Sequence, residues 1–269
     1  MSSAVKLIGL PTDRNSSHLR GPAKAPAAIR ALLMSGMSNL CAQNGIDLEN
    51  PDIFVDEGDI DLCEDTGDFA KIVEASRQAF ERGAAVFLGG DHFVTWPILE
   101  GLVSARTPPP HLVHIDAHPD LYPDFEGNLQ SHASPMARLS ENGRLRSLTQ
   151  IGIRTVNAVQ QKQIDRYGVT VIAPSELANL ADLLPTGPTY ITIDLDGLDP
   201  AFAPGVSHHE PGGLSVREVL DIIKKLPGPI IGADIVELNP VRDINHMTAA
   251  VAVKLLKELV ARIYGDQPA

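Results

Sequence analysis

Short apolar runs typical of strands alternate with helical segments along the whole chain, and this alternation constrains the fold more than any other feature. Glycines, prolines and capping residues separate the segments. Strands that alternate with helices favour an α/β fold, a doubly wound domain with a mainly parallel sheet. No linker, repeat or low-complexity segment interrupts the pattern, so one domain is expected over residues 1–269. The predicted strands are 5–10, 53–55, 84–88, 112–115, 149–153, 169–172, 189–195 and 230–236; the predicted helices are 26–34, 69–82, 94–103, 135–141, 156–167, 175–184, 215–226 and 248–263.

Composition and charge exclude several classes of partner. A hydrophobic content of 43% over 269 residues is ample for one large core, while the formal charge of −12 argues against nucleic acid and against an anionic membrane surface. A small cationic substrate would suit this charge, although many cytosolic enzymes are acidic for other reasons. Cys41 and Cys63 have neither metal nor redox spacing, and the chain has neither a signal-peptide pattern nor a membrane-length apolar run. We therefore expect a cytoplasmic protein.

The stretch LVHIDAHPD, residues 112–120, carries the first chemical signal. A strand-like run ends at Ile115, and Asp116, His118 and Asp120 follow it at alternate positions. In an extended segment these side chains would point the same way. Two carboxylates and an imidazole held together are costly unless a cation neutralises them. The stretch therefore predicts half of a metal site.

Two further clusters follow predicted strands. His92 comes after Gly-Gly-Asp91, and Asp194 and Asp196 lie in ITIDLDGLDP. Taken alone, His92 could equally cap a helix, and the aspartate pair could form a turn at a strand end. Asp199, which precedes a proline, is more typical of a turn, and Asp91 is expected to orient a ligand or the loop. Because ligands in such sheets bind outside the carboxyl ends of the strands, we expect the clusters to meet.

Together the clusters supply four carboxylates and two imidazoles. This is too many ligands for one tetrahedral zinc ion and too many oxygens for a thiophilic metal. Two Mn²⁺ ions bridged by carboxylates fit the set. A water between ions about 3.5–4 Å apart would be acidified to a hydroxide nucleophile.

These three motifs, in this order and spacing, resemble the signatures of the ureohydrolase family, which comprises arginase, agmatinase and their relatives. The stretches AHPDLYPDFEGN…SHAS and PGVSHHEPGGLS look most like plant-type arginases. The resemblance implies a three-layer α/β/α fold with an eight-stranded, mainly parallel sheet. It also implies two Mn²⁺ per chain, hydrolysis of a guanidino group to urea by a hydroxide that bridges the ions, and a trimeric or hexameric assembly.

Carried over to this sequence, the resemblance assigns roles to individual residues. His132 matches a histidine proposed as proton shuttle, with Asp120 as a second candidate relay. Glu237, in ADIVELNP, matches the glutamate that grips the guanidinium, and a carboxylate offers the two acceptors that this planar cation needs. The six matched metal ligands are His92, Asp116, His118, Asp120, Asp194 and Asp196.

The sequence departs from the family pattern where the other end of the substrate would bind. His208 and His209 lie where the usual loop reads Gly-Thr-Gly-Thr-Pro, and Asn157 replaces the aspartate of animal arginases, as it also does in the plant type. These three residues are the predicted substrate contacts. Asparagine can donate or accept, and histidines add donors, which favours arginine, with its carboxylate, over agmatine.

Alternative functions remain open at this point. Agmatine or another guanidino compound could replace L-arginine as the substrate that is cleaved to urea, with L-ornithine as the co-product for arginine and putrescine for agmatine. A deacetylase of the same superfamily fold would use one zinc ion and fewer ligands, and a catalytically silent binding protein would usually have lost ligands. The complete set of six argues against the last two.

Overall fold

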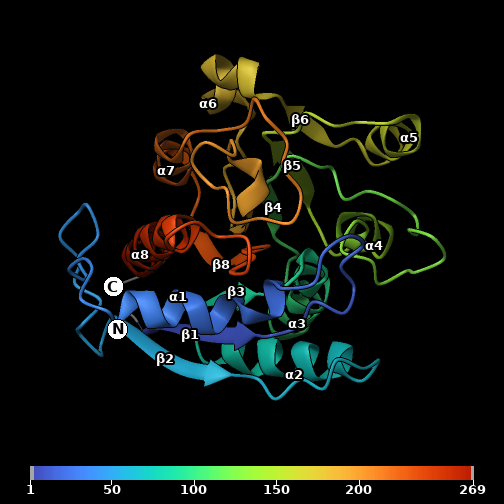
Figure 1. Cartoon of the computed structure of the whole chain (residues 1–269). Helices are drawn as coiled ribbons and strands as arrows, with labels where there is room; N and C mark the ends of the chain where they lie inside the picture. Colours follow the sequence, from blue (N-terminus) through green and yellow to red (C-terminus); the bar gives the residue numbers. More distant parts are fainter. Residues whose placement is uncertain (1–2, 268–269) are drawn as a thin grey trace.

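Eight parallel strands form one sheet in the computed structural model, which describes residues 3–267 (Figure 1). The strand order is β2-β1-β3-β8-β7-β4-β5-β6, and every pair of neighbours is parallel. The predicted α/β fold is therefore confirmed. The strands are β1 (Val5–Leu10), β2 (Phe54–Asp59), β3 (Ala85–Gly89), β4 (His111–Ile115), β5 (Ser147–Ile151), β6 (Thr170–Ile172), β7 (Thr189–Asp194) and β8 (Ile230–Val236).

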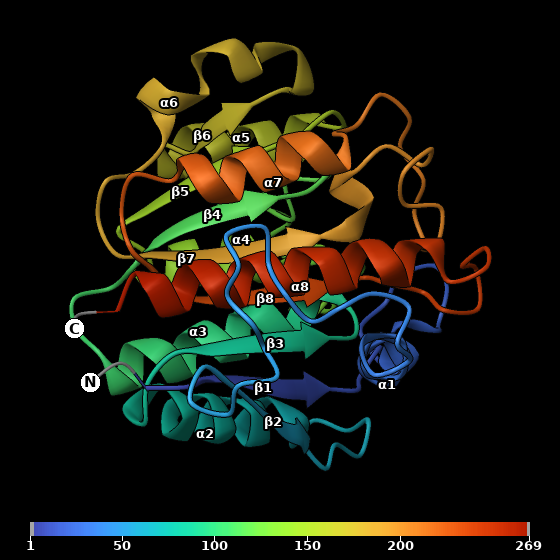
Figure 2. The ribbon, with the colours of Figure 1, turned by 90° about the vertical axis from the view of Figure 1, so that its left-hand side faces the viewer.

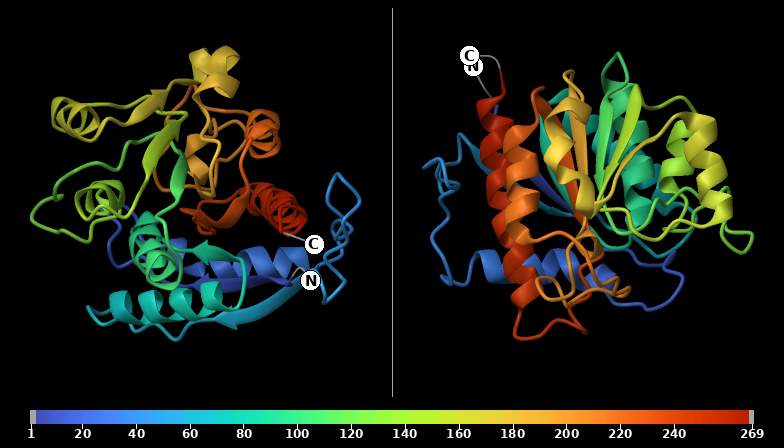
Figure 3. Two further views of the ribbon diagram at one scale, coloured as in Figure 1. Left: turned by 180° about the vertical axis from the view of Figure 1, so that it is seen from behind. Right: turned by 90° about the horizontal axis from the view of Figure 1, so that it is seen from above.

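Helices cover both faces of the sheet, as Figure 2 and the right-hand view of Figure 3 show. The α-helices are α1 (Ala25–Leu33), α2 (Asp68–Glu81), α3 (Thr95–Ala105), α4 (Pro135–Glu141), α5 (Ala158–Tyr167), α6 (Leu180–Leu183), α7 (Val216–Lys225) and α8 (Met247–Gly265). Short 3₁₀ helices are η1 (Pro22–Lys24), η2 (His92–Val94), η3 (Pro174–Asn179) and η4 (Leu195–Gly197). Within residues 3–267, no helix has both the length and the apolar character needed to cross a membrane.

Alternate residues of the strands feed two separate cores. In β3, Val86 and Leu88 pack in the core that contains α1, α7 and α8, whereas Ala85 and Phe87 pack in the core that contains α2, α3 and α4. All four side chains are fully buried. Burial on both faces explains why the strands have near-continuous apolar sequences instead of strict alternation.

Element bounds lie within two residues of the sequence-based predictions at most ends, with three differences. β2 runs to Asp59, four residues beyond the strand predicted over 53–55. β5 ends at Ile151, two residues before its predicted end, because Gly152 turns the chain with φ of 98°. The segment predicted as one helix over 175–184 is the 3₁₀ helix η3 followed by the single turn α6. The predicted capping box at α7 is confirmed: Ser215 Oγ accepts from the N–H of Glu218, and the Glu218 carboxylate accepts from the N–H of Ser215.

Strand order brings distant segments of the chain together. In the sheet, β3, β8, β7 and β4 are consecutive neighbours. Because they are parallel, their carboxyl ends lie at the same edge, and the segments that follow them meet there. All three predicted clusters and Glu237 lie at or just after the carboxyl end of one of these four strands.

Candidate metal centre and substrate cavity

His92 is held by an unusually close approach of two backbone segments. A Cβ atom on Gly90 would lie 1.7 Å from the carbonyl oxygen of Thr12, so this position requires glycine. The N–H of Asp91 donates to the same carbonyl at 3.0 Å. η2 begins directly after this contact, at His92, whose side chain is fully buried at the carboxyl ends of the strands.

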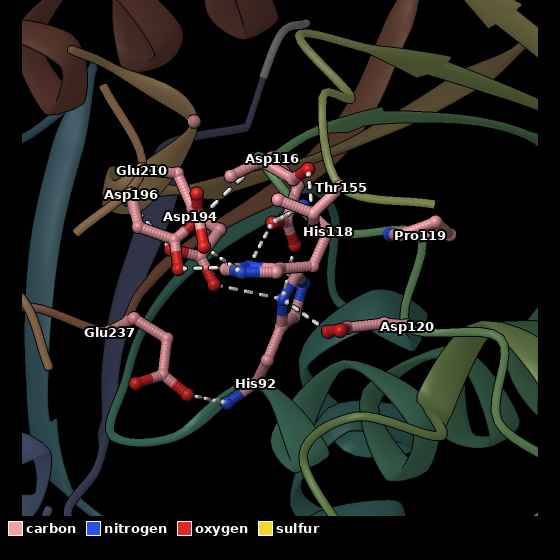
Figure 4. A network of polar contacts seen from close by, with 12 residues as sticks. His92, Asp116, His118, Pro119, Asp120, Thr155, Asp194, Asp196, Glu210 and Glu237 are labelled. Atoms are coloured by element: carbon pink, nitrogen blue, oxygen red, sulfur yellow. Dashed lines mark hydrogen bonds and ion pairs between the residues drawn. The ribbon is translucent and has the colours of Figure 1, made fainter. Parts of the chain in front are cut away.

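Three carboxylates surround one nitrogen of His92 (Figure 4). His92 Nδ1 lies 3.1 Å from Asp116 Oδ2, 3.1 Å from Asp120 Oδ2 and 3.2 Å from Asp194 Oδ2. Although Nδ1 is buried, it has no well-aligned hydrogen-bond partner among the described residues. Four ligand atoms that face one another without hydrogen bonds between them are the arrangement expected around a cation.

The hydrogen bonds behind His92 fix which nitrogen carries the proton. Thr192 Oγ1 donates to Asp234 Oδ1 at 2.5 Å, so it accepts from His92 Nε2, which lies 2.9 Å away. Nε2 therefore carries a proton, and Nδ1 is the nitrogen that can offer a lone pair to a cation among the three carboxylates. A ring whose distal N–H is held in this way is typical of a metal-binding histidine.

A second group of ligands shares Asp116 with the first. His118 Nδ1 lies 3.2 Å from Asp196 Oδ2 and 3.4 Å from Asp116 Oδ1. Asp116 thus presents Oδ2 to the first group and Oδ1 to the second. The structure brings all six predicted ligands together as two adjoining groups with one carboxylate in common.

The local geometry behind this arrangement differs from the predicted one. The segment after Ile115 is not an extended continuation of β4, because the chain turns and Asp120 has a φ of 51°. As a result, His118 joins Asp196 while Asp120 joins His92. The expectation that Asp116, His118 and Asp120 share one face of an extended segment is therefore wrong, although they still converge on one site.

Burial and mutual repulsion make the carboxylate cluster costly without a cation. Burial, together with the charges of Asp196 and Asp116, raises the pKa of Asp194 well above its usual value. Burial and the charge of Asp116 raise the pKa of Asp196 to about 6. Such carboxyls take up protons when they lack a cation, and divalent ions displace those protons. The residues present therefore fit a centre of two divalent ions.

Glu237 and His132 form a pair beside the two groups. Glu237 has a φ of 65° directly after β8, and its Oε1 accepts from the N–H of His92 at 2.9 Å and from His132 Nδ1 at 2.8 Å. Burial disfavours the charged ring, but Glu237 outweighs it and raises the pKa of His132 to about 9. Left-handed backbone at a residue other than glycine is strained and often marks a functional site.

The loop before α1 contributes a residue that sequence reasoning missed. Ser17 places its N–H 3.1 Å and its Oγ 2.8 Å from His132 Nε2. A neutral ring can accept from the N–H, and a protonated ring can donate to Oγ, so His132 has a partner in either protonation state. The predicted supporting residue Asp91 is buried and accepts from the N–H of Asn15 in the same loop at 2.8 Å. The sequence alone indicated only a polar loop here.

A cavity of about 400 Å³ opens from this cluster. Its volume is in the range of small-molecule sites, and carboxylates and histidines line it together with the aromatic rings of Tyr122 and Phe125. The residues that line it are Ser17, His118, Asp120, Tyr122, Phe125, His132, Ala133, Thr155, Val156, Asn157, Gln160, Asp194, Asp196, His208, Glu210 and Glu237.

Two of the three predicted substrate contacts line the cavity and one does not. The His208 ring centroid lies 5.4 Å from that of His132. His209 is exposed, and its Nε2 lies 2.7 Å from the carbonyl oxygen of Pro204, so its side chain is used to hold its own loop. The structure does not place His209 at the cavity, and its assignment as a substrate contact stays a prediction. His208 lines the cavity as predicted. Glu210 also lines it, and no sequence pattern indicated that residue.

Asn157 lines the cavity but is also the N-cap of α5. Its Oδ1 accepts from the N–H groups of Val159 and Gln160, both at 3.0 Å, and its Nδ2 donates to the hydroxyl of Tyr122. The side-chain oxygen of Asn157 is therefore already used to cap α5.

Replacing Asn157 with alanine is expected to lower the free energy of unfolding by about 0.5–2 kcal/mol, because α5 loses its cap. Urea denaturation followed by circular dichroism measures this change. Asn157→Ser keeps a capping oxygen and is the matched control, expected within about 0.5 kcal/mol of the wild type. An equal loss of unfolding free energy in both variants would show that Asn157 does not stabilise the protein by capping α5.

Comparison with known proteins places these features in context. The model of the Arginase family matches residues 3–261. Arginase 1, mitochondrial, from Arabidopsis thaliana is 40% identical over 278 residues, 97% of this chain and 81% of the relative. An agmatinase from Bacillus cereus is 31% identical over 96% of this chain and 91% of the relative. The arginase structure from Medicago truncatula superposes with a TM-score of 0.91 at 36% identity, covering 97% of this chain and 88% of that one.

Proposed function

The chain belongs to the arginase family, ureohydrolases that cleave C–N bonds of linear amidines, and we propose that it hydrolyses L-arginine to L-ornithine and urea. One observation carries the proposal. Two ligand groups that share Asp116 lie beside the Glu237 carboxylate in one cavity that fits a guanidino compound. The 40% identity to a plant arginase, against 31% to an agmatinase, favours arginine as substrate.

The six ligands would hold two Mn²⁺ ions. His92, Asp116, Asp120 and Asp194 form the first group, and Asp116, His118 and Asp196 form the second. Four carboxylates and two imidazoles suit Mn²⁺ better than a thiophilic metal. When bound, a pair of divalent ions supplies Lewis acidity and makes water a nucleophile at neutral pH.

Glu237 is positioned to bind the guanidinium. Its Oε1 is fixed by His92 and His132, whereas its Oε2 accepts no hydrogen bond from the residues that the structure describes. The charge of His132 outweighs the effect of burial and holds the pKa of Glu237 below its usual value, so the carboxylate is ionised at neutral pH. An ionised carboxylate with a free oxygen can accept two N–H groups of a guanidinium and so orient its carbon.

His132 is positioned to carry a proton between the cavity and the exposed loop that contains Ser17. Glu237 holds Nδ1, and Nε2 faces Ser17, which can bond to the ring in both protonation states. Departure of the amine requires a proton, and His132 can deliver it, with Asp120 as the second candidate.

We assign the amino end of the substrate to Glu210. This residue contributes the only carboxylate among the described cavity-lining residues that is neither in a ligand group nor Glu237. Its Oε1 lies 3.8 Å from His118 Nε2, and Arg154 holds its backbone carbonyl with a 2.8 Å hydrogen bond from Nε. His208 and Asn157 remain the proposed contacts for the carboxylate of arginine.

Glu210→Gln is therefore expected to raise KM for arginine about fivefold, the effect of losing a partly exposed charge pair, with kcat nearly unchanged. Initial-rate kinetics of urea release measure both constants. Agmatine should show the same rise, because its terminal ammonium would use the same contact. Glu218 is an exposed acid at the start of α7 that does not line the cavity, and Glu218→Gln is the control because glutamine can keep the capping box. An unchanged KM in Glu210→Gln would refute the assignment.

The experiment that tests the proposed function is urea release from a panel of substrates, with Mn²⁺ supplied. Arginine should be turned over faster than agmatine and faster than guanidinobutyrate at equal concentration. Faster turnover of agmatine would favour the second candidate, an agmatinase. Elemental analysis separates the remaining alternatives, since two ions per chain fit a ureohydrolase, one fits a deacetylase and none fits a silent binding protein.

We also propose a homo-oligomer, a trimer or hexamer, in the cytoplasm, with no nucleic acid or membrane partner. Large apolar side chains are exposed beyond β7 and β8, among them Phe202 at 42%, Val241 at 68% and Ile244 at 56%. Contact between subunits would cover such side chains. Light scattering coupled to size exclusion measures the assembly directly.

A further inference from the structure

A third histidine, His114, contacts the shared carboxylate and has no role in the function described so far. It lies in β4, is fully buried, and points to the same side of the strand end as Asp116. Its Nε2 lies 2.7 Å from Asp116 Oδ2, the oxygen that also faces His92 Nδ1. What His114 does therefore depends on whether Nε2 carries a proton or a lone pair.

Gln150 on the neighbouring strand answers this question. β4 and β5 pair in register, with His114 directly opposite Gln150. Gln150 Nε2 lies 2.6 Å from the carbonyl oxygen of Pro119 and 2.9 Å from His114 Nδ1. A peptide carbonyl can only accept, so the atom that faces Pro119 must be the amide nitrogen. Its second proton points to Nδ1, which must accept, and the ring proton is consequently on Nε2.

We propose that His114 and Gln150 are positioning residues that hold Asp116 between the two metal ions, and that His114 is not itself a ligand. The inference rests on the proposed function, because it concerns the same metal centre. Each oxygen of Asp116 accepts one hydrogen bond from the protein: Oδ1 from the N–H of His118 at 2.6 Å, and Oδ2 from His114. Each oxygen then keeps a lone pair for one ligand group, and the carboxylate cannot rotate away from either.

The alternative, that His114 is a further ligand of the first group, requires a different proton arrangement. Nε2 would have to lose its proton, and Nδ1 would then carry one that points at the Gln150 amide nitrogen, so that two donors face each other. Flipping the amide would place Oε1 against the carbonyl of Pro119, so that two acceptors face each other. The observed orientation leaves Oε1 without a partner among the described residues, which is the smaller cost.

Mn²⁺ binding to metal-free variants tests the inference, with free Mn²⁺ measured by electron paramagnetic resonance. His114→Met removes the donor at similar volume and should weaken Mn²⁺ binding about 10–100-fold, the effect of losing a hydrogen bond to a ligand. His114→Gln, whose amide nitrogen can take the place of Nε2, should recover most of that loss while two ions still bind. Gln150→Met should weaken binding as well, since nothing then fixes the ring proton on Nε2.

The outcomes separate this inference from the proposed function. Wild-type affinity in His114→Met would overturn the positioning role, and loss of one whole ion in both His114 variants would identify His114 as a ligand. A wild-type protein that binds no Mn²⁺ would overturn the proposed function instead. Nitrogen NMR of histidine-labelled, metal-free wild type tests the proton arrangement even if a variant does not fold. A proton on Nε2 of His114 is expected, and a proton on Nδ1 would refute the inference.

Discussion

Asp196→Ala is expected to lower turnover at least ~100-fold and to leave one bound ion per chain in place of two. The reason is that the second ligand group consists of only Asp116, His118 and Asp196 in the part of the chain that the structure describes. Without both ions, water loses the acidification that makes it a nucleophile at neutral pH. Urea release and elemental analysis of the purified variant measure the two effects.

The fold should survive this substitution. Asp196 lies in η4, at the edge of the sheet, and belongs to neither hydrophobic core. Circular dichroism should therefore match that of the wild type. Asp196→Asn keeps the shape and an acceptor for the N–H of Ala117 while removing the charge, and should show the same loss. Asp221→Ala, at an exposed acid on α7, is the control expected to retain full activity. Two fully occupied ions in active Asp196→Ala would contradict the assignment.

His132→Asn is expected to lower turnover about 10²–10⁴-fold, the usual range for a general acid or base. Asparagine places an amide nitrogen near the position of Nδ1, so it can keep the hydrogen bond to Glu237 while lacking anything in place of Nε2. Substrate binding, which depends on Glu237, should change much less than turnover. Steady-state kinetics therefore separate a proton carrier, which lowers kcat, from a binding residue, which raises KM.

Two companion variants sharpen this test. His132→Ala leaves space that imidazole added to the buffer can enter, and part of the lost rate should return. Ser17→Ala removes Oγ but keeps the backbone N–H, so the neutral ring retains a partner and the protonated ring loses one. Its effect should accordingly be smaller than that of His132→Asn. Unchanged turnover in His132→Asn across the pH range would assign the histidine to the loop structure alone.

Local sequence determined most of the fold. β1, β8 and α4 have the bounds that their apolar patterns predicted, and the capping box of α7 forms as Ser215 and Glu218 indicated. These features depend on residues within a few positions of one another, such as caps, turn-forming glycines and the spacing of apolar side chains. Helix 175–184 was predicted less well, because its apolar spacing fits 3₁₀ geometry followed by a single α-turn as well as one continuous α-helix.

The sequence also determined which residues meet, because acids and histidines that follow parallel strands must reach the same edge of a sheet. The motifs identified the six ligand residues in this way, and the family resemblance added His132 and Glu237. The sequence could not determine how the six ligands divide into two groups. That division depends on the strand order β3-β8-β7-β4 and on the turn at Asp120, which is left-handed against local preference.

Only the tertiary structure revealed the residues that hold this site in place. Ser17 reaches His132 across 115 positions of sequence, and Gln150 reaches His114 across 36. In the sequence these residues are an ordinary loop serine and a glutamine in an apolar strand, with no periodicity or motif that marks them. His209 shows the converse, because its ring bonds to the carbonyl of Pro204 in its own loop while the ring of His208 lines the cavity. Such partners are chosen by strand register and loop path, which long-range packing fixes and local sequence does not encode.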